Sequence, residues 1–168
     1  MTFEENMNVL NLALDQFQKN ILQFLAITLS KEEKRHLVEH EFLGITAVHQ
    51  VVGLGDTEMI EIILQKFHGN LNAKAKQSIT VLHFAAQNYS GYLAILILSS
   101  SLDGKRGFKF DPNVQTELGA TPLHFAVIHK ELKNVELLIA RGADLNATDN
   151  QLRTPLHIAV IRMCAQMQ

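Results

Sequence analysis

The segment 31–41 carries the residues with the most evident capacity for chemistry, because His36, Glu39 and His40 spell the pattern H-x-x-E-H. Two histidines four residues apart lie on one face of a helix, where both imidazoles can bind one zinc ion. Glu39 would then act as the general base of a zinc-dependent hydrolase. Such chemistry also needs a third ligand and an open cleft, and no peptidase context accompanies the five residues. A charged, solvated helix is therefore the favoured interpretation, and the zinc hydrolase is an alternative.

Other catalytic patterns are weaker still. Gly53 and Gly55 follow an apolar run as in a dinucleotide-binding loop, but Glu58 stands where that loop needs its third glycine. The sequence shows neither a nucleophile elbow nor a phosphate-binding loop, and its single cysteine, Cys164, has no evident histidine or asparagine partner. We therefore expect no enzyme activity, no cofactor, and neither catalytic nor metal-binding residues.

Four histidines stand at matching places in the chain, each three residues after a threonine. The pairs are Thr46–His49, Thr80–His83, Thr121–His124 and Thr154–His157. A column of histidines could suggest a metal site, but stacked helical units lie about 10 Å apart. That distance is too long for shared ligation of one zinc ion at about 2 Å per bond. A structural role is therefore expected for these histidines.

The threonine–histidine pairs belong to a longer repeat, which must position every other feature of the chain. Residues 121–127 read TPLHFAV, and residues 154–160 read TPLHIAV, which is nearly a copy. Residues 80–86, TVLHFAA, are a clear relative, and residues 46–49, TAVH, are a weaker one. A fixed period of about 33 residues indicates a repeat array, in which neighbouring units shield apolar faces that no unit can bury alone.

The residues of one repeat predict two short helices. Thr121 is a good N-cap, and Pro122 suits the first helical position because it gives up no hydrogen bond there. Apolar residues in the segment 123–127 fall on one helical face, and residues 135–139 form a second apolar run. Gly142 follows as a C-terminal stop, since glycine adopts the left-handed conformation at little cost.

The repeat unit resembles the ankyrin repeat, because it combines a TPLH run, a second helix and the segment GADLNA at residues 142–147. The resemblance is specific over residues 113–160 and looser over residues 46–112. It implies an all-α ankyrin-repeat solenoid of stacked helix-turn-helix units with hairpin-like finger loops. It also implies a non-catalytic protein–protein interaction scaffold that binds through its finger loops and its concave inner-helix face. The resemblance also implies a structural role for the threonine–histidine pairs, in which the histidine bonds between neighbouring fingers. The residues with this role are Thr80, His83, Thr121, His124, Thr154 and His157.

The repeats divide the chain into two expected domains. Residues 45–168 hold the ankyrin-repeat array, with units that start near 46, 80 and 121 and a half unit from 154. Residues 1–44 are expected to form an N-terminal helical cap. This cap begins with a degenerate ankyrin-like unit, counted from Asn8 as N-cap, and continues with a charged helix that Ser30 and Glu33 cap. A generic helical hairpin is the alternative to the degenerate unit.

An insertion separates two of the repeats, because the step from Thr80 to Thr121 is longer than the step from Thr121 to Thr154. The surplus falls in residues 99–110. Insertions in repeat proteins map to loops, which often lie on a binding face. Basic residues beside an aromatic one could grip an acidic partner or a phosphate: Lys105, Arg106, Phe108 and Lys109. A tolerated loop with one phenylalanine packed on the core is the alternative.

The resemblance implies partner contacts at finger tips and inner-helix positions. These positions are Lys76, Gln77, Ile79, Gln87, Asn88, Glu117, Leu118, Ala120, Ile128, His129, Asn150, Gln151, Arg153, Ile161 and Arg162. Leu118 and Ile128 are of most interest, because apolar residues at a wet edge suggest a partner, although each could also pack on its neighbour. Asn146 resembles the ankyrin asparagine that some intracellular hydroxylases modify, with Asn113 and Asn72 as weaker candidates; a turn-closing asparagine is the alternative.

Composition bounds the remaining possibilities. A net charge of −2 over 168 residues gives no nucleic-acid signature. The apolar run 21–29 is too short to span a membrane, and a single cysteine fits a reducing compartment. An intracellular, cytoplasmic protein with a protein partner is expected. The alternative is a bacterial effector in a host cytosol or a fragment of a larger multidomain protein. The half unit leaves Ile158 and Ile161 without a covering helix, which favours truncation, a partner or self-association at this end.

Overall fold

The structure, a computed structural model, describes residues 2–16, 18–41, 44–70, 73–87 and 111–165. The chain forms two compact modules, an N-terminal module of residues 1–76 and a C-terminal module of residues 77–168. The regular elements of the described residues are helices. None of these helices combines the length and the apolar content that crossing a membrane requires. The domain boundary expected after residue 44 stays a prediction.

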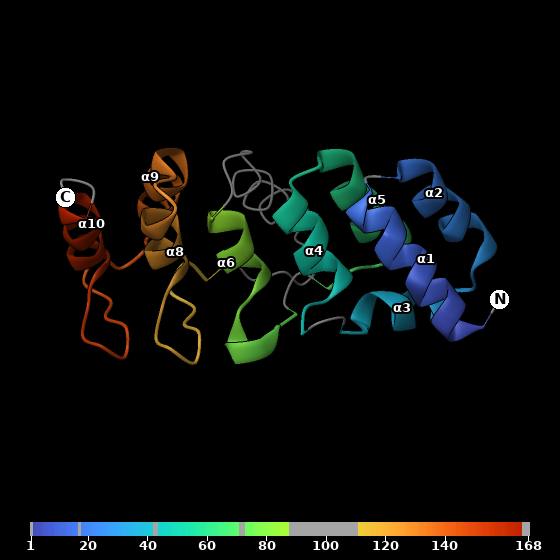
Figure 1. Ribbon diagram of the computed structural model, residues 1–168, viewed down its shortest axis with the longest axis horizontal. Coiled ribbons are helices and arrows are strands. Elements are labelled where there is room, and N and C mark those ends of the chain that lie inside the picture. Colours follow the sequence, from blue (N-terminus) through green and yellow to red (C-terminus); the bar gives the residue numbers. More distant parts are fainter. Residues whose placement is uncertain (1, 17, 42–43, 71–72, 88–110, 166–168) are drawn as a thin grey trace. The chain divides into compact units, whose positions relative to one another are not determined.

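The N-terminal module consists of two stacked helical hairpins and a short helix between them. Its helices are α1 (Phe3–Asp15), α2 (Lys19–Thr28), α3 (Lys31–Glu39), α4 (Ala47–Leu54) and α5 (Thr57–Lys66) (Figure 1). α1 packs against α4 and α2 packs against α5, so equivalent helices of the two hairpins meet. Leu10, Leu22 and Ile63 are fully buried in this stack. Each hairpin thus shields the apolar face of the other, as neighbouring units of a repeat array do.

A lysine at the start of α2 reinforces this stack. The Nζ atom of Lys19 lies 2.8 Å from a carboxylate oxygen of Glu58 and 3.0 Å from one of Asp56. The pKa of Lys19 is raised mainly by its hydrogen bond to Glu58 and next by its hydrogen bond to Asp56. Asp56 is also the N-cap of α5, where its carboxylate accepts the backbone N–H of Met59 at 3.1 Å. One carboxylate therefore caps a helix and pairs with the neighbouring hairpin.

The start expected for the first helix is wrong, because α1 begins at Phe3 and Asn8 lies inside the helix as an exposed residue. The N-cap is Thr2, whose backbone N–H donates to the Glu5 carboxylate at 2.7 Å. The Thr2 hydroxyl in turn accepts the Glu5 backbone N–H at 3.3 Å. This reciprocal capping box satisfies two amides that the helix itself leaves unpaired. The helix therefore starts well before the expected position.

The charged helix α3 begins directly after Ser30, as the sequence predicts, and ends at Glu39. Ser30 and Glu33 form the predicted capping box, with the Ser30 N–H donating to Glu33 at 2.8 Å. The hydrogen bonds from Ser30 lower the pKa of Glu33. His40 follows the helix with an extended backbone (φ −69°, ψ 132°). The His40 backbone N–H still bonds to the His36 carbonyl at 3.0 Å, so the two histidines lie one turn apart at the end of α3.

The C-terminal module is built around α8. Its helices are α6 (Val81–Ala86), α8 (Pro122–Ile128), α9 (Leu132–Ala140) and α10 (Pro155–Cys164), preceded by a short 3-10 helix, η1 (Lys76–Ser78). α8 packs against α6, α9 and α10, and Figure 1 shows α6, α8 and α10 in a row. The second helix of the repeat from Thr80 and the insertion 99–110, with Lys105, Arg106, Phe108 and Lys109, lie outside the described residues.

The same threonine–histidine clamp starts four of the helices. The threonine backbone N–H donates to the histidine Nδ1, at 3.4 Å for Thr46, 3.1 Å for Thr80, 3.1 Å for Thr121 and 3.2 Å for Thr154. Because an amide can only donate, Nδ1 is the acceptor and Nε2 carries the ring proton. Nε2 of His83 donates to the Ala120 carbonyl at 3.1 Å, and Nε2 of His124 donates to the Arg153 carbonyl at 3.0 Å. In the C-terminal module, these rings join a helix start to the next finger loop.

Candidate functional site

The finger loops of the C-terminal module are tied together at their tips. The Glu117 backbone N–H donates to the Gln77 carbonyl at 2.9 Å, and the Asn150 N–H donates to the Leu118 carbonyl at 3.0 Å. The Asn150 side chain adds a bond from Nδ2 to the Glu117 carbonyl at 2.8 Å. Below the tips, Gln115 Nε2 donates to the Thr148 carbonyl at 3.3 Å. Three successive fingers are therefore fixed relative to one another before any partner binds.

Close approach of neighbouring fingers explains a glycine at one tip. Gly119 has φ +74°, a conformation that side chains disfavour, and a Cβ atom there would lie 2.9 Å from the Asn150 backbone nitrogen. One repeat later, Leu152 occupies the same place with φ +59° and is 79% exposed. A bulky residue in this conformation is a backbone outlier. Two equivalent finger tips thus carry a glycine and a strained, exposed leucine.

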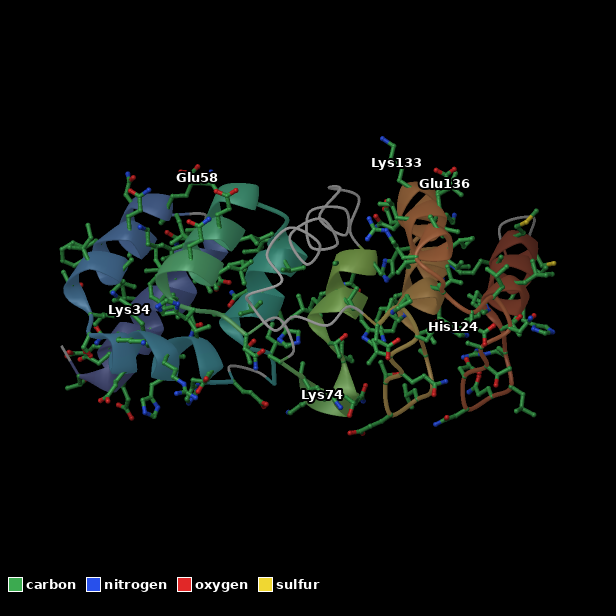
Figure 2. All side chains as sticks on the ribbon, turned by 180° about the vertical axis from the view of Figure 1, so that it is seen from behind. Lys34, Glu58, Lys74, His124, Lys133 and Glu136 are labelled. Atoms are coloured by element: carbon green, nitrogen blue, oxygen red, sulfur yellow. The ribbon has the colours of Figure 1, made fainter. Side chains whose placement is uncertain are left out.

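A groove of about 280 Å³ lies between these fingers and the inner helices. Its apolar lining comes from both sources, with Ile79, Leu118 and Ala120 on the fingers and Phe125, Ile128 and Ile158 on α8 and α10. Polar residues complete the lining: Gln77, Thr116, Asp149, Asn150, Gln151 and Arg153. Figure 2 labels His124 at the start of α8, where the helix meets its finger loop, and shows Lys133 and Glu136 on α9 away from the fingers.

The two charged residues that line the groove, Asp149 and Arg153, form an ion pair. Asp149 is 6% exposed; its Oδ1 accepts the backbone N–H groups of Gln151 and Arg153, each at 2.9 Å. Its Oδ2 accepts Nε of Arg153 at 2.8 Å and lies 2.6 Å from Nη2 of the same guanidinium. Burial alone would raise the pKa of Asp149, but the hydrogen bonds from Arg153 and Gln151 outweigh it and hold that pKa below its ordinary value.

Seven of the finger positions and one inner-helix position expected to bind a partner line this groove. They are Gln77, Ile79, Leu118, Ala120, Ile128, Asn150, Gln151 and Arg153. The other expected positions in this module do not line it: Gln87 ends α6, Glu117 is exposed at a tip, His129 follows α8, and Ile161 and Arg162 are exposed in α10. Lys76 belongs to the N-terminal module, and Asn88 lies outside the described residues. A binding role for any of these residues stays a prediction.

Sequence reasoning missed Phe125, which reads as a core position because it follows a TPLH run. It expected Ile158 to be left without cover, which is wrong, since Ile158 is 7% exposed and lines the groove. It also missed Leu152, although Gly119 holds the equivalent place one repeat earlier and marks it as one needing a left-handed backbone. The repeat period, applied to single residues, was the signal that could have identified Leu152.

The asparagines considered for modification have different surroundings. Asn146 is exposed, and its backbone N–H donates to the Asp144 carboxylate at 2.9 Å. The Asn113 side chain is engaged, because its Oδ1 accepts the Asp144 N–H at 2.7 Å and its Nδ2 donates to the Gly142 carbonyl at 3.1 Å. Asn72 lies outside the described residues. Modification of Asn146 stays a prediction.

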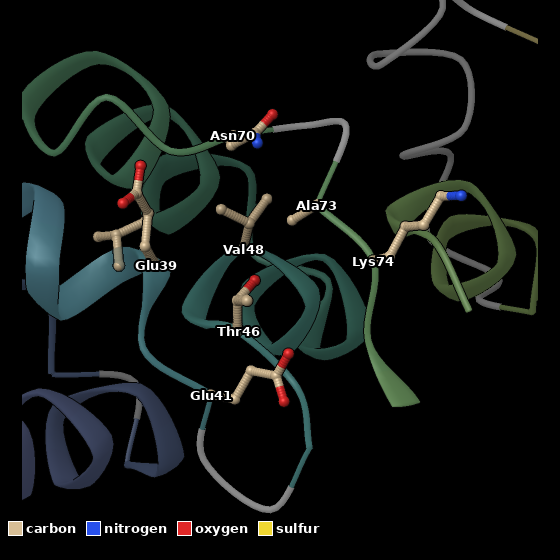
Figure 3. Close-up of a pocket in the computed structure, with 8 residues that line it drawn as sticks. Glu39, Glu41, Thr46, Val48, Asn70, Ala73 and Lys74 are labelled. Carbon is tan, nitrogen blue, oxygen red and sulfur yellow. The ribbon is translucent and has the colours of Figure 1, made fainter. Parts of the chain in front are cut away.

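A second pocket, of about 240 Å³, lies in the N-terminal module beside the H-x-x-E-H segment. Figure 3 shows its lining residues, which come from the end of α3, from the start of α4 and from the chain after α5. Glu39 lines this pocket and accepts Nε of Arg35 at 2.9 Å. Within the residues that the structure describes, no group of three or more histidine, cysteine, aspartate or glutamate side chains is placed to hold a metal ion.

Comparisons with known proteins give one consistent result. A family model described as ankyrin repeats (many copies) matches residues 105–159. An ankyrin repeat protein of Acanthamoeba polyphaga mimivirus is 30% identical over 119 residues, which are 70% of this chain and 14% of that protein. Human ankyrin repeat domain-containing protein 53 is 32% identical over 136 residues, 77% of this chain and 24% of that protein. NF-kappa-B inhibitor alpha of Gallus gallus is 47% identical over 47 residues, 28% of this chain and 15% of that protein.

The chain thus spans between 14% and 24% of the length of these relatives. The matched residues 105–159 include the two most similar TPLH runs, the fingers around Leu118 and Gln151, and α8 and α9. Sequence similarity and helical architecture agree, and the chain belongs to the ankyrin-repeat family, with an all-α fold of stacked repeats.

Proposed function

We propose that this chain is a non-catalytic scaffold that binds a partner protein, with the finger groove of the C-terminal module as its binding site. Ankyrin repeats imply a role in protein–protein interaction. The observation that carries the choice of site is the groove itself, where Leu118 is 60% exposed among polar finger residues. Exposed apolar side chains at a concave, polar-rimmed surface are typical of binding sites.

The size and rigidity of the groove indicate what it receives. A cavity of about 150 Å³ holds a benzene ring, so 280 Å³ is ample for one aromatic or leucine-sized side chain. The hydrogen bonds between the finger tips fix the groove in advance, which lowers the entropy cost of binding. A partner that presents one apolar anchor would gain hydrophobic free energy without first ordering the site.

Replacing Leu118 by aspartate tests this proposal. Because Leu118 is largely exposed, Leu118→Asp should shift the thermal midpoint by less than about 2 °C and weaken capture of the partner at least about tenfold. The measurement is affinity capture from lysate, with quantitative mass spectrometry of proteins retained by each variant. Leu132→Asp is the matched control, since Leu132 is 75% exposed on α9 and does not line the groove. Equal loss in both variants, or unchanged capture by Leu118→Asp, would contradict the site.

We also propose self-association through the outward face of α10 as a second, independent mode of interaction. Leu123 and Leu156 occupy the same place in successive repeats, yet Leu123 is 1% exposed and Leu156 is 71% exposed. Val160 and Met163 extend the exposed stripe along α10, at 52% and 65%. α8, the equivalent helix one repeat earlier, is covered by α10. A second copy that packs its own α10 against this stripe would bury it in the same helix-on-helix manner.

A further inference from the structure

The guanidinium of Arg153 has unused hydrogen-bonding capacity at the groove. An arginine side chain carries five N–H donors in a planar fork. Nε and Nη2 of Arg153 are engaged by Oδ2 of Asp149, which occupies one edge of that fork and leaves the other edge open. The Arg153 side chain is 41% exposed and the residue lines the groove. The donors on its open edge are therefore accessible to a molecule bound there.

Of the residues that line the groove, Asp149 and Arg153 carry a full charge. Asp149 is buried, and its two oxygens already accept bonds from Gln151 and Arg153, so it offers little to a ligand. Arg153 keeps accessible donors and its positive charge. The groove thus combines an apolar floor with one cationic group, and the ligand chemistry that complements them is an apolar side chain next to an anion.

Glu117 sets the direction of such a ligand. It is exposed at the finger tip, where its backbone N–H bonds to the Gln77 carbonyl and its own carbonyl accepts Nδ2 of Asn150 from the last finger. A carboxylate placed beside Glu117 would be repelled, whereas one placed beside Arg153 would be attracted. The anion of the ligand must therefore lie toward the last finger, with the apolar anchor over Leu118 and Ile128.

We propose that the partner of the finger groove is a protein segment in which a bulky apolar side chain is followed closely by an aspartate or glutamate that pairs with Arg153. The apolar side chain occupies the groove, and the carboxylate accepts two N–H groups from the open edge of the guanidinium. The two groups must lie close together in that segment, because Arg153 and the apolar residues line the same groove. This inference rests on the proposed function of the groove and specifies its ligand.

Selection from a library of random peptides, displayed against the purified full chain, tests the inference. Peptides enriched by the native chain should contain a leucine, phenylalanine or similar side chain close to an aspartate or glutamate. In a synthetic peptide from this set, replacing the acid by its amide should weaken binding to the native chain about tenfold. The same acid-to-amide replacement should not change binding to Arg153→Met. It should weaken binding to Arg153→Lys by less than tenfold, because lysine keeps the positive charge but lacks the paired N–H donors of the guanidinium.

The outcomes of this experiment distinguish a failure of the proposed ligand from a failure of the proposed binding site. If the native chain enriches no peptide over Leu118→Asp, the groove is not the binding site and both proposals fail. If apolar peptides are enriched without a preference for acid, or if the acid matters equally in Arg153→Met, the inference fails and the groove remains the site. The acid-to-amide comparison uses the native chain, so it stands even if Arg153→Met folds poorly. Circular dichroism of each variant identifies that case.

Discussion

At the scale of single residues, His124 and His157 share one sequence context but have different surroundings. Each follows a threonine and a proline at a helix start, and each accepts the threonine N–H at its Nδ1 atom. His124 is fully buried, and its Nε2 donates across to the Arg153 carbonyl at 3.0 Å. His157 is exposed. Comparing His124 with His157 therefore separates two contributions to the free energy of unfolding: the capping of one helix, and the hydrogen bond that joins neighbouring repeats.

Alanine at these two positions should have unequal costs. His124→Ala leaves the Thr121 N–H and the Arg153 carbonyl without their partners in a buried place, so we expect a loss of about 3 kcal/mol in the free energy of unfolding. His157→Ala removes only an exposed cap, and we expect a loss of about 1 kcal/mol. Urea unfolding followed by circular dichroism measures both values. Similar losses for the two variants would mean that the bond between repeats contributes little.

At the scale of elements, successive finger loops differ in backbone strain at one equivalent place. Gly119 and Leu152 hold the same left-handed place in successive fingers, with φ of +74° and +59°. Glycine adopts this conformation freely, whereas a leucine there costs of order 1 kcal/mol. The Leu152 side chain is 79% exposed, so burial of apolar surface recovers little of that cost.

Exchanging the residue type at each of these fingers should have opposite effects. Leu152→Gly should stabilise the chain by about 0.5–1 kcal/mol, because it removes the strain and only an exposed side chain. Gly119→Ala should destabilise it by about 2 kcal/mol or more, since a Cβ there meets the Asn150 backbone nitrogen at 2.9 Å. Thermal and urea unfolding of the two variants provide the comparison. A loss of stability in Leu152→Gly would show that the leucine packs against something in the free protein.

At the scale of the whole molecule, the repeat period predicted more than any local pattern. Four copies of the threonine–histidine pair constrain the starts of α4, α6, α8 and α10 independently, and all four begin one residue after the threonine. The first helix has no such copy, and counting from Asn8 missed the capping box of Thr2 and Glu5. The groove shows a similar limit of sequence patterns. The pattern marks a helical residue as apolar but does not show whether it faces the core or a finger loop. Phe125 was missed for that reason.

Self-association is a property of the whole molecule and is tested there. Light scattering over a range of concentrations should give a mass rising from 18.8 kDa toward twice that value, since apolar stripes that pair weakly associate at high concentration. Leu156→Glu should keep the chain monomeric throughout. Leu132→Glu is the control, because Leu132 is 75% exposed on α9, away from the stripe. A monomeric native chain at every concentration would contradict the proposed mode.

The contrast between Gly119 and Leu152 also bears on how far a regular array of this kind can grow. The next finger passes within 2.9 Å of where a Cβ would stand at Gly119, and Leu152 places a whole isobutyl group at the equivalent spot. A designed consensus repeat grafted behind α10 should therefore pack more closely if residue 152 is first changed to glycine, which would give the grafted finger the clearance that Gly119 gives its neighbour.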